Sequence, residues 1–210
     1  MSQFFSIHPD NPNARLIRQA ATMLRDGAVI VYPTDSGYAL GCHLDDKAAV
    51  TRIRQIRGLD EDHYLTLVCR DLSEIAHYSR VDNRIFRLLK ANTPGGYTFI
   101  LEATREVPRR LQHPKRSTVG IRVPNQPVAL ALLEELGEPL LSSTLILPEA
   151  NYPLTDVDEI RTHLERQVDL IIEGGIVGID PTTVIDLSGE TPQLLRRGLG
   201  DPAPFGLESQ

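Results

Sequence analysis

The chain has 210 residues, of which 41% are hydrophobic and 24% charged, and its formal net charge is −6. These values are typical of a globular protein with a sizeable core, and they exclude collagen-like, disordered and disulfide-scaffold proteins. The negative charge argues against a general nucleic-acid coat protein.

This charge is unevenly distributed along the chain. Residues 47–122 contain 15 Lys/Arg and 8 Asp/Glu, a balance of +7, whereas the remaining residues have a balance of −13. A basic stretch of this kind attracts phosphate-bearing ligands, and solvated helix faces are the alternative interpretation.

The first half of the chain predicts alternating helices and strands. A helix begins at Asn11-Pro12 and ends at Gly27, and a strand over 28–32 is ended by Pro33. A helix capped by Asp46 follows. The next predicted elements are a strand over 65–69, a helix over 82–90 and a strand over 97–101.

The second half predicts more strands than helices. The expected elements are strands over 118–123, 139–143, 169–173, 182–187 and 193–196, a helix from Asn125 or Gln126 to Leu136, and a helix over 156–166. Because several neighbouring strands lack a helix between them, we expect an α/β protein with a mixed parallel and antiparallel sheet flanked by helices. We predict a single domain over 1–210, with its core at about 12–200.

The cysteine, histidine and apolar patterns indicate a reducing cellular compartment and argue against metal sites and membrane-spanning segments. Cys42 and Cys69 have no CxxC or zinc-like spacing, so we expect reduced, buried thiols in a cytoplasmic protein. The N-terminus lacks signal-peptide features, and no apolar run is long enough to span a membrane. The six His are scattered, so we expect no structural metal.

The common catalytic templates are absent from the sequence, and hydroxyl-rich or Arg-bearing strand ends remain. There is no phosphate loop, no GxGxxG after a strand and no GxSxG elbow. Residues 33–38 (PTDSGY) follow a predicted strand, and Thr34 would offer a hydroxyl at the sheet edge, where ligands bind in open α/β sheets. Turn chemistry at Asp35-Ser36-Gly37 is the alternative.

The strand over 118–122 (TVGIR) carries an arginine. Alternation places Arg122 on the same face as Gly120 and Thr118, where a guanidinium would grip a carboxylate or phosphate. An exposed surface arginine is the alternative. Three further segments of this kind are 142–144 (SST), 181–184 (PTTV) and 195–198 (LRRG).

Taken together and in this order, these segments resemble the YrdC-like family. The matching stretches are YPTDSGYALG, TPGGYTFIL, TVGIRVPNQP, PTTVIDL and LLRRGLGD, and the opening FFSIHPDNP is similar to the YciO-type branch. The resemblance implies a twisted mixed sheet with a concave basic face suited to nucleotide and to tRNA or double-stranded RNA.

Enzymes of this family join L-threonine, bicarbonate and ATP into threonylcarbamoyl-AMP and pyrophosphate, for the t6A modification of tRNA. The resemblance therefore implies ATP with Mg²⁺ as cofactors. It assigns Thr34, Arg122 and Thr182 to a threonine-like acid. It assigns Arg57, Thr118, Ser142, Thr144 and Arg196 to the nucleotide.

The sequence departs from the synthase pattern at two pairs. A Lys-x-Arg pair is replaced by Arg57-Gly58-Leu59, and a Ser-x-Asn pair by Thr144-Leu145-Ile146. Losing one charge-assisted contact costs about 1.5–3 kcal/mol, and losing a transition-state contact costs roughly 10²–10³ in rate. The loop after Arg57-Gly58-Leu59 carries Asp60, Glu61 and Asp62, whose charges would repel a triphosphate.

Two functions follow from these observations. The first is an RNA-binding and nucleotide-binding protein on the synthase fold, with weak or no turnover. Its RNA-contact candidates are Arg52, Arg54, Arg109, Arg110, Lys115 and Arg116. The alternative is an active enzyme of the threonylcarbamoyl-AMP synthase type, a nucleotidyltransferase acting in t6A modification.

Overall fold

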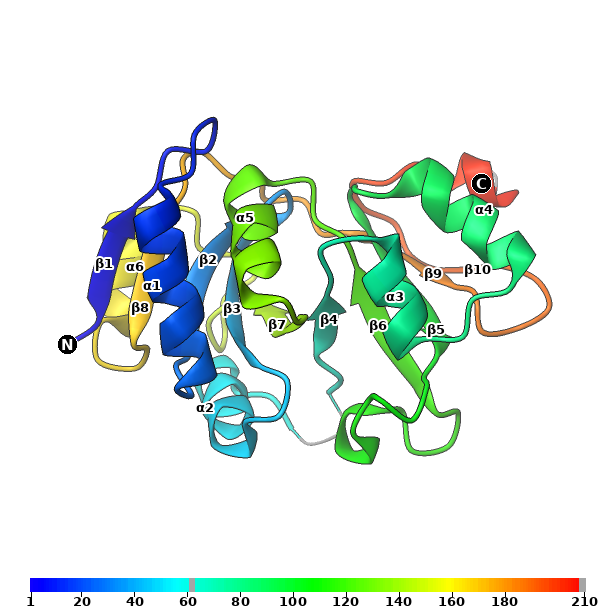
Figure 1. The fold of residues 1–210 in the computed structure, drawn as a ribbon, viewed down its shortest axis with the longest axis horizontal. Helices are drawn as coiled ribbons and strands as arrows, with labels where there is room; N and C mark the ends of the chain where they lie inside the picture. Colours follow the sequence, from blue (N-terminus) through cyan, green and yellow to red (C-terminus); the bar gives the residue numbers. More distant parts are fainter. Residues whose placement is uncertain (61–62, 208–210) are drawn as a thin grey trace. The chain divides into compact units, whose positions relative to one another are not determined.

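The structure is a computed structural model that describes residues 1–60 and 63–207. The chain forms two compact units: unit 1 consists of Met1–His63 and Gln126–Ile179, and unit 2 of Tyr64–Asn125 and Asp180–Gln210. Each unit is therefore built from two separate stretches of sequence. Figure 1 labels the helices and strands of both.

Unit 1 contains a five-stranded part of the sheet in the order β1-β8-β2-β3-β7. Its strands are β1 (Gln3–Ser6), β2 (Ile30–Thr34), β3 (Gly37–His43), β7 (Leu140–Thr144) and β8 (Leu170–Glu173). β8 is parallel to both β1 and β2, whereas β3 is antiparallel to both β2 and β7. The unit thus has mixed strand directions.

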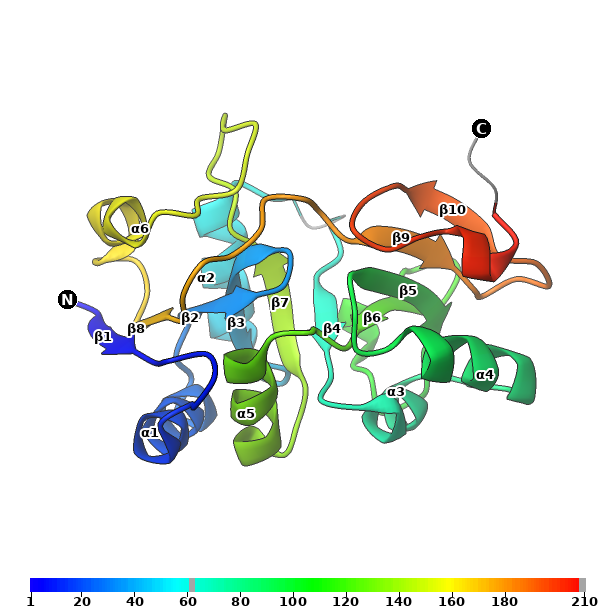
Figure 2. The same ribbon diagram turned by 90° about the horizontal axis from the view of Figure 1, so that it is seen from above.

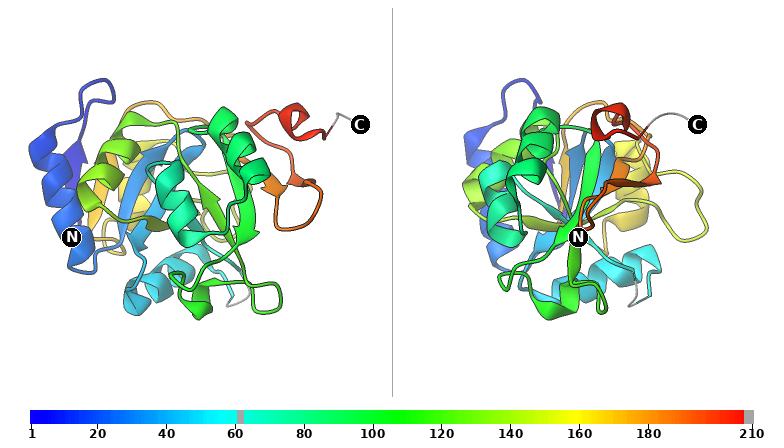
Figure 3. Two further views of the ribbon diagram at one scale, coloured as in Figure 1. Left: turned by 45° about the vertical axis from the view of Figure 1, so that its right-hand side comes forward. Right: turned by 90° about the vertical axis from the view of Figure 1, so that its right-hand side faces the viewer.

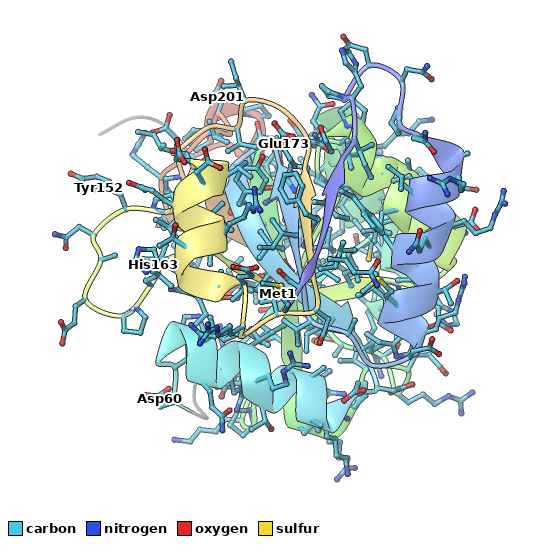
Figure 4. The ribbon with its side chains drawn as sticks, turned by 90° about the vertical axis from the view of Figure 1, so that its left-hand side faces the viewer. Met1, Asp60, Tyr152, His163, Glu173 and Asp201 are labelled. Carbon is cyan, nitrogen blue, oxygen red and sulfur yellow. The ribbon has the colours of Figure 1, made fainter. Side chains whose placement is uncertain are left out.

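The helices of unit 1 cover both faces of these strands. They are α1 (Ala14–Arg25), α2 (Lys47–Arg57), α5 (Pro127–Leu136) and α6 (Val157–Leu164). Figure 2 shows α1 and α5 on one face and α2 and α6 on the other. Figure 4, which looks at this unit, likewise shows α1 across the strands from α6, the helix that carries His163.

Helix ends in unit 1 follow the capping residues of the sequence. Asp46 accepts the backbone N–H of Ala49, as predicted, and Gln126 caps α5. The prediction for the first helix was wrong by two residues. Asn13, not Asn11, caps it, because the Asn13 side chain accepts the N–H groups of Arg15 and Leu16.

Unit 2 contains strands in the order β4-β6-β5-β9-β10. They are β4 (Thr66–Val68), β5 (Tyr97–Glu102), β6 (Thr118–Arg122), β9 (Thr183–Asp186) and β10 (Gln193–Arg196). β4 is parallel to β6 and β5 is parallel to β9, while the β5–β6 and β9–β10 pairs are antiparallel. Short 3-10 turns lie at Arg109–Leu111 and Ala203–Phe205.

The two faces of the unit 2 sheet differ in polarity. One face carries the buried apolar residues Phe99, Leu101, Val119, Ile121 and Ile185. Helices α3 (Leu72–Tyr78) and α4 (Asn83–Asn92) lie together on one side of these strands (Figures 2 and 3), and their buried Ile75, Ile85 and Leu89 supply an apolar layer. Strand register places the opposite set on one "polar face": Thr66, Val68, Thr98, Ile100, Glu102, Thr118, Gly120, Arg122, Val184, Asp186, Gln193 and Arg196.

The predicted α/β class with a mixed sheet and flanking helices is confirmed. The strand predicted to end at Pro33 continues through Thr34 and turns directly into β3, a strand that the sequence patterns did not predict. Pro33 is tolerated because β8 pairs with β2 only at Ile30 and Val31, so no ladder bond to β8 is lost. β1 and α3 were also missed. The single-domain organisation and the concave face stay predictions.

Candidate functional site

Arg122 lies at the end of β6 on the polar face of unit 2. Register places it with Gly120 and Thr118, as alternation predicts. Arg122 is only 6% exposed and Thr118 only 4% exposed, so the alternative of an exposed surface arginine is wrong. Burying a guanidinium is costly unless hydrogen bonds or an opposite charge offset the loss of hydration.

Thr182 and Arg196 form a hydrogen-bonded cluster with Thr98, a residue that the sequence patterns did not single out. Arg196 donates from Nε and Nη2 to the carbonyl of Thr182 and from Nη2 to its hydroxyl, at 2.9–3.1 Å. The Thr182 hydroxyl also shares a 2.8 Å hydrogen bond with that of Thr98. All three residues belong to unit 2. The signal for Thr98 was a polar residue between Tyr97 and Phe99, on the opposite face of a hydrophobic strand.

The electrostatics of the cluster favour an anionic ligand. Burial lowers the pKa of Arg196, and the nearby positive charge of Arg122 lowers it further. Arg196 remains charged at neutral pH despite this lowering, because an arginine pKa lies far above 7. Two neighbouring guanidinium groups with adjacent threonine hydroxyls provide the donors that a carboxylate or phosphate requires.

Gly198, two residues after Arg196, allows this cluster to form. A Cβ on Gly198 would collide with the carbonyl oxygen of Pro181 and lie 2.6 Å from the carbonyl carbon of Thr182. The chain therefore approaches the Thr182 backbone at a distance that only glycine permits. This close approach explains why the RRGLGD stretch has a glycine at position 198.

In unit 1, the hydroxyl of Thr34 fixes the β2–β3 turn. It donates to the carbonyl of Gly37 at 2.6 Å and accepts the backbone N–H of Ser36 at 3.2 Å. Gly37 has φ +122°, in the region that favours glycine. The Thr34 hydroxyl therefore stabilises the turn by hydrogen bonds to its backbone. A further role of Thr34 in amino-acid binding stays a prediction.

The other unit 1 candidates lie around β7. The Ser142 hydroxyl donates to the carbonyl of Leu40 and shares a 2.8 Å hydrogen bond with the buried Tyr32 hydroxyl. Arg57, the last residue of α2, donates from Nε to the Ser143 hydroxyl at 3.2 Å, and burial lowers its pKa. Thr144 is exposed. Unit 1 thus brings Arg57 to the same strand as Ser142 and Thr144.

The positions that depart from the synthase pattern also lie in unit 1. Leu59 follows the left-handed Gly58 that ends α2, and Ile146 follows β7 by two residues. Asp60 is exposed (Figure 4). Glu61 and Asp62 lie outside the described residues. Burial lowers the pKa of His63 most, and the positive charges of Arg57 and Arg54 lower it further. The segment around His63 therefore has cationic as well as acidic neighbours.

The RNA-contact candidates fall into two groups. Arg52 and Arg54 lie on α2 in unit 1, where Arg52 forms a 2.9 Å ion pair with Asp169. Arg109, Arg110, Lys115 and Arg116 are exposed on the segment between β5 and β6 of unit 2. Arg116 forms a 2.8 Å ion pair with the buried Asp186.

Within the part of the chain that the structure describes, no group of three or more His, Cys, Asp or Glu is placed to hold a metal ion. The same residues include no helix long and apolar enough to cross a membrane. Cys42 and Cys69 are free and buried, as predicted, and burial raises the pKa of the Cys69 thiol well above its ordinary value.

Known proteins resemble this chain over almost its whole length. A family model described as "Telomere recombination", of the Sua5/YciO/YrdC family, matches residues 22–198. Uncharacterized protein YciO of Escherichia coli K12 is 61% identical over 205 residues, which cover 98% of this chain and 100% of that protein. The crystal structure of E. coli YciO has a TM-score of 0.93 over 98% of this chain and 100% of that chain.

Relatives with a named activity are more distant. The threonylcarbamoyl-AMP synthase of Halorhodospira halophila is 32% identical over 183 residues, covering 86% of this chain and 94% of that protein. The crystal structure of P. abyssi Sua5 complexed with L-threonine is 26% identical, with a TM-score of 0.86 over 94% of this chain and 58% of that chain. The predicted resemblance is therefore confirmed: this chain belongs to the Sua5/YciO/YrdC family, and threonylcarbamoyl-AMP synthases are among its relatives.

Proposed function

We propose that this protein binds a nucleotide, a threonine-like amino acid and RNA, with weak or no synthase turnover. The observation that carries the proposal is the cluster in unit 2, where Arg196 lies near the buried Arg122 and bonds Thr182. Within unit 2, Arg122 and Thr182 would hold the amino acid, and Thr118 and Arg196 would contact the nucleotide. The ligand contacts expected of Thr34, Arg57, Ser142 and Thr144, which belong to unit 1, stay predictions.

Weak turnover is proposed because two polar groups of the synthase pattern are replaced by Leu59 and Ile146. Neither side chain can donate a hydrogen bond to a phosphate. Each lost contact to the developing charge would lower the rate roughly 10²–10³-fold, while ground-state binding through the arginines would be less affected.

The second candidate function is an active synthase of the threonylcarbamoyl-AMP type. It is favoured by the retained cation at Arg57 and by the relation to enzymes of that name. In that reaction threonine, bicarbonate and ATP would give threonylcarbamoyl-AMP, pyrophosphate and water. Mg²⁺ would neutralise charge on the triphosphate; the described residues offer guanidinium and hydroxyl groups to the phosphates rather than a carboxylate cluster to the metal.

A turnover assay distinguishes the two functions. The protein is incubated with ATP, Mg²⁺, bicarbonate and labelled threonine, and pyrophosphate and the adenylate are measured alongside calorimetric binding of ATP. The proposal expects ATP binding that weakens in Arg196→Ala, with turnover close to background. Rapid turnover that disappears in Arg122→Ala would establish the synthase instead.

Restoring the two missing polar groups sharpens the test. We expect Leu59→Arg with Ile146→Asn to raise turnover at least about 10²-fold, because it returns donors at both departing positions. Leu59→Met with Ile146→Leu is the matched control, which changes side-chain shape without adding donors. Equal rates in the two double variants would contradict the reason given for weak turnover.

Binding of RNA and a cytoplasmic location complete the proposal. The exposed cations between β5 and β6 would contact phosphates, and the relation to threonylcarbamoyl-AMP synthases makes tRNA the RNA to test first. The two free, buried thiols suit a reducing compartment.

A further inference from the structure

A basic groove lies in unit 2 where the chain passes from β5 to β6. It has a volume of about 700 Å³. Its polar lining residues are Arg80, Thr104, Arg105, Arg109, Gln112, His113 and Ser117, and the remaining lining residues are Ala103, Val107, Pro108 and Pro114. We call these eleven residues the β5–β6 groove.

The groove is separate from the cluster around Arg122. Ser117 precedes the first residue of β6, whereas Arg122 is the last residue of that strand. At ~3.3 Å per residue the two ends of β6 are about 13 Å apart. A ligand in the groove would therefore contact a different set of side chains from a ligand bound by Arg122.

Internal hydrogen bonds hold the groove in shape. The Gln112 side chain donates to the carbonyls of Val107 and Thr104, at 2.7 and 3.4 Å, and the Thr104 hydroxyl donates to the carbonyl of His77. Val107 and Leu111 of the same segment are buried. Because the backbone is already ordered, a ligand would bind without the entropic cost of ordering a loop.

His113 is oriented by the same segment. Its Nδ1 accepts the backbone N–H groups of Lys115 and Arg116, each at 3.2 Å, and its ring stacks on Tyr64 with centroids 5.2 Å apart. Because Nδ1 is an acceptor, the ring proton lies on Nε2, and His113 offers this N–H as a hydrogen-bond donor.

The lining is cationic, and its acidic neighbours neutralise it only weakly. Arg80 and Arg105 form long ion pairs with Glu102 and Glu106, at 3.8 and 3.4 Å, in which the Arg105 side chain is 94% exposed. Neither glutamate lines the groove. Exposed pairs of this kind are weak and leave the arginines available to a phosphate. Over residues 103–117 there are five Lys/Arg and one Glu.

We propose that the β5–β6 groove binds the phosphate backbone of RNA. This inference rests on the proposed RNA-binding function and gives it a location. Three arginines from two segments, together with hydroxyl and imidazole donors, match the several closely spaced phosphates of a nucleic-acid strand. The cations beside the groove, Arg110, Lys115 and Arg116, would extend the contact along the strand.

The test measures affinity for an unmodified tRNA as a function of salt. The test variant is Arg105→Gln with Arg109→Gln. The control is Arg87→Gln with Lys90→Gln, which removes the same charge from exposed positions of α4 in the same unit. All four side chains lie on the surface, so both variants should fold.

We expect the groove variant to bind tRNA about tenfold more weakly, and its slope of log affinity against log salt to fall by about 2. The control variant should retain the wild-type slope, and ATP binding should be unchanged in both. Equal effects in the two variants would overturn the groove as the contact, while leaving RNA binding intact. No measurable binding by the wild type would instead refute the proposed RNA function itself.

Discussion

The shared hydrogen bond between Thr98 and Thr182 leaves one hydroxyl hydrogen available to a ligand. The Thr182 hydroxyl oxygen accepts from Arg196, so it uses one lone pair there. If Thr98 donates to the second lone pair, the hydrogen of Thr182 stays available. If Thr182 instead donates to Thr98, the hydroxyl hydrogen of Thr98 stays available. Either way, the pair would supply one donor beside the two guanidinium groups.

We predict that Thr98→Val weakens binding of the anionic ligand about 5- to 10-fold, because one hydrogen bond in a buried site is lost. Calorimetric titration with ATP and with threonine measures this change. Thr98→Ser keeps the hydroxyl and is the matched control, which should bind almost as the wild type does. An equal loss in both variants would point to the packing of the methyl group instead.

A second buried polar residue, Asp186, holds Arg116 by an ion pair. Its carboxylate also accepts the N–H and the hydroxyl of Ser188. Burial would raise the pKa of Asp186, but the hydrogen bonds from Ser188 and the contact with Arg116 outweigh this effect and hold it below its ordinary 3.8. The ionised carboxylate is thus favoured in the folded protein.

Because this pKa is lowered on folding, the stabilisation from Asp186 is present above pH ~4 and is lost as the pH falls through the folded-state pKa. We predict that Asp186→Asn lowers the free energy of unfolding at neutral pH and flattens its decline in acid. Urea unfolding at a series of pH values measures both. An unchanged acid slope in the variant would show that other carboxylates cause the decline.

At the scale of elements, the β9–β10 pair and its following loop position Arg196. β10 is an edge strand with a register shift between Leu194 and Arg196, and the backbone then packs at Gly198 against Pro181 and Thr182, the two residues before β9. The shift turns the Arg196 side chain toward Thr182. The site therefore depends on the backbone path as well as on the side chains.

We predict that Gly198→Ala destabilises the fold by about 1–3 kcal/mol and weakens ATP binding, because the new Cβ collides with the backbone of Pro181 and Thr182. Chemical denaturation and calorimetry measure the two effects. Gly189→Ala is the matched control, since Gly189, like Gly198, does not have a positive φ, and a Cβ there would come no closer than 3.9 Å to its nearest neighbour, the carbonyl oxygen of Thr191. It should change stability little and leave ATP binding unchanged.

At the scale of the whole molecule, charge separates by unit. Unit 1 contains 9 Lys/Arg and 18 Asp/Glu, a balance of −9, and unit 2 contains 13 and 10, a balance of +3. The basic stretch of the sequence therefore belongs mainly to unit 2. The acidic remainder belongs mainly to unit 1, so the overall value of −6 describes neither.

Since the chain passes between the units three times, we predict that residues 1–125 do not fold cooperatively on their own. This piece lacks β7, β8, α5 and α6 of unit 1 and β9 and β10 of unit 2. Far-UV circular dichroism during urea titration should show no sigmoidal transition for the piece and one for the full chain. A cooperative transition in the piece would contradict the proposal that 1–210 is a single domain.

Sequence patterns by themselves determined the family, the α/β class and most elements. Helices are short-range structures, so capping residues such as Asp46 and amphipathic spacing locate them. Period-2 alternation likewise places Arg122 on one strand face with Gly120 and Thr118, and this placement needs no information beyond the order of the residues.

Tertiary structure decided what each side chain contacts. β3 was missed because its residues Gly37–His43 include two glycines, and its stability comes from pairing with both β2 and β7. The hydrogen-bonded cluster joins Thr182 to Thr98, 84 positions away, and to Arg196, 14 positions away, and no local pattern encodes such pairings. Sequence alone determines which residues are available and, in a regular strand, which of them share a face. Long-range strand pairing, with irregularities such as the register shift in β10, determines which of them meet.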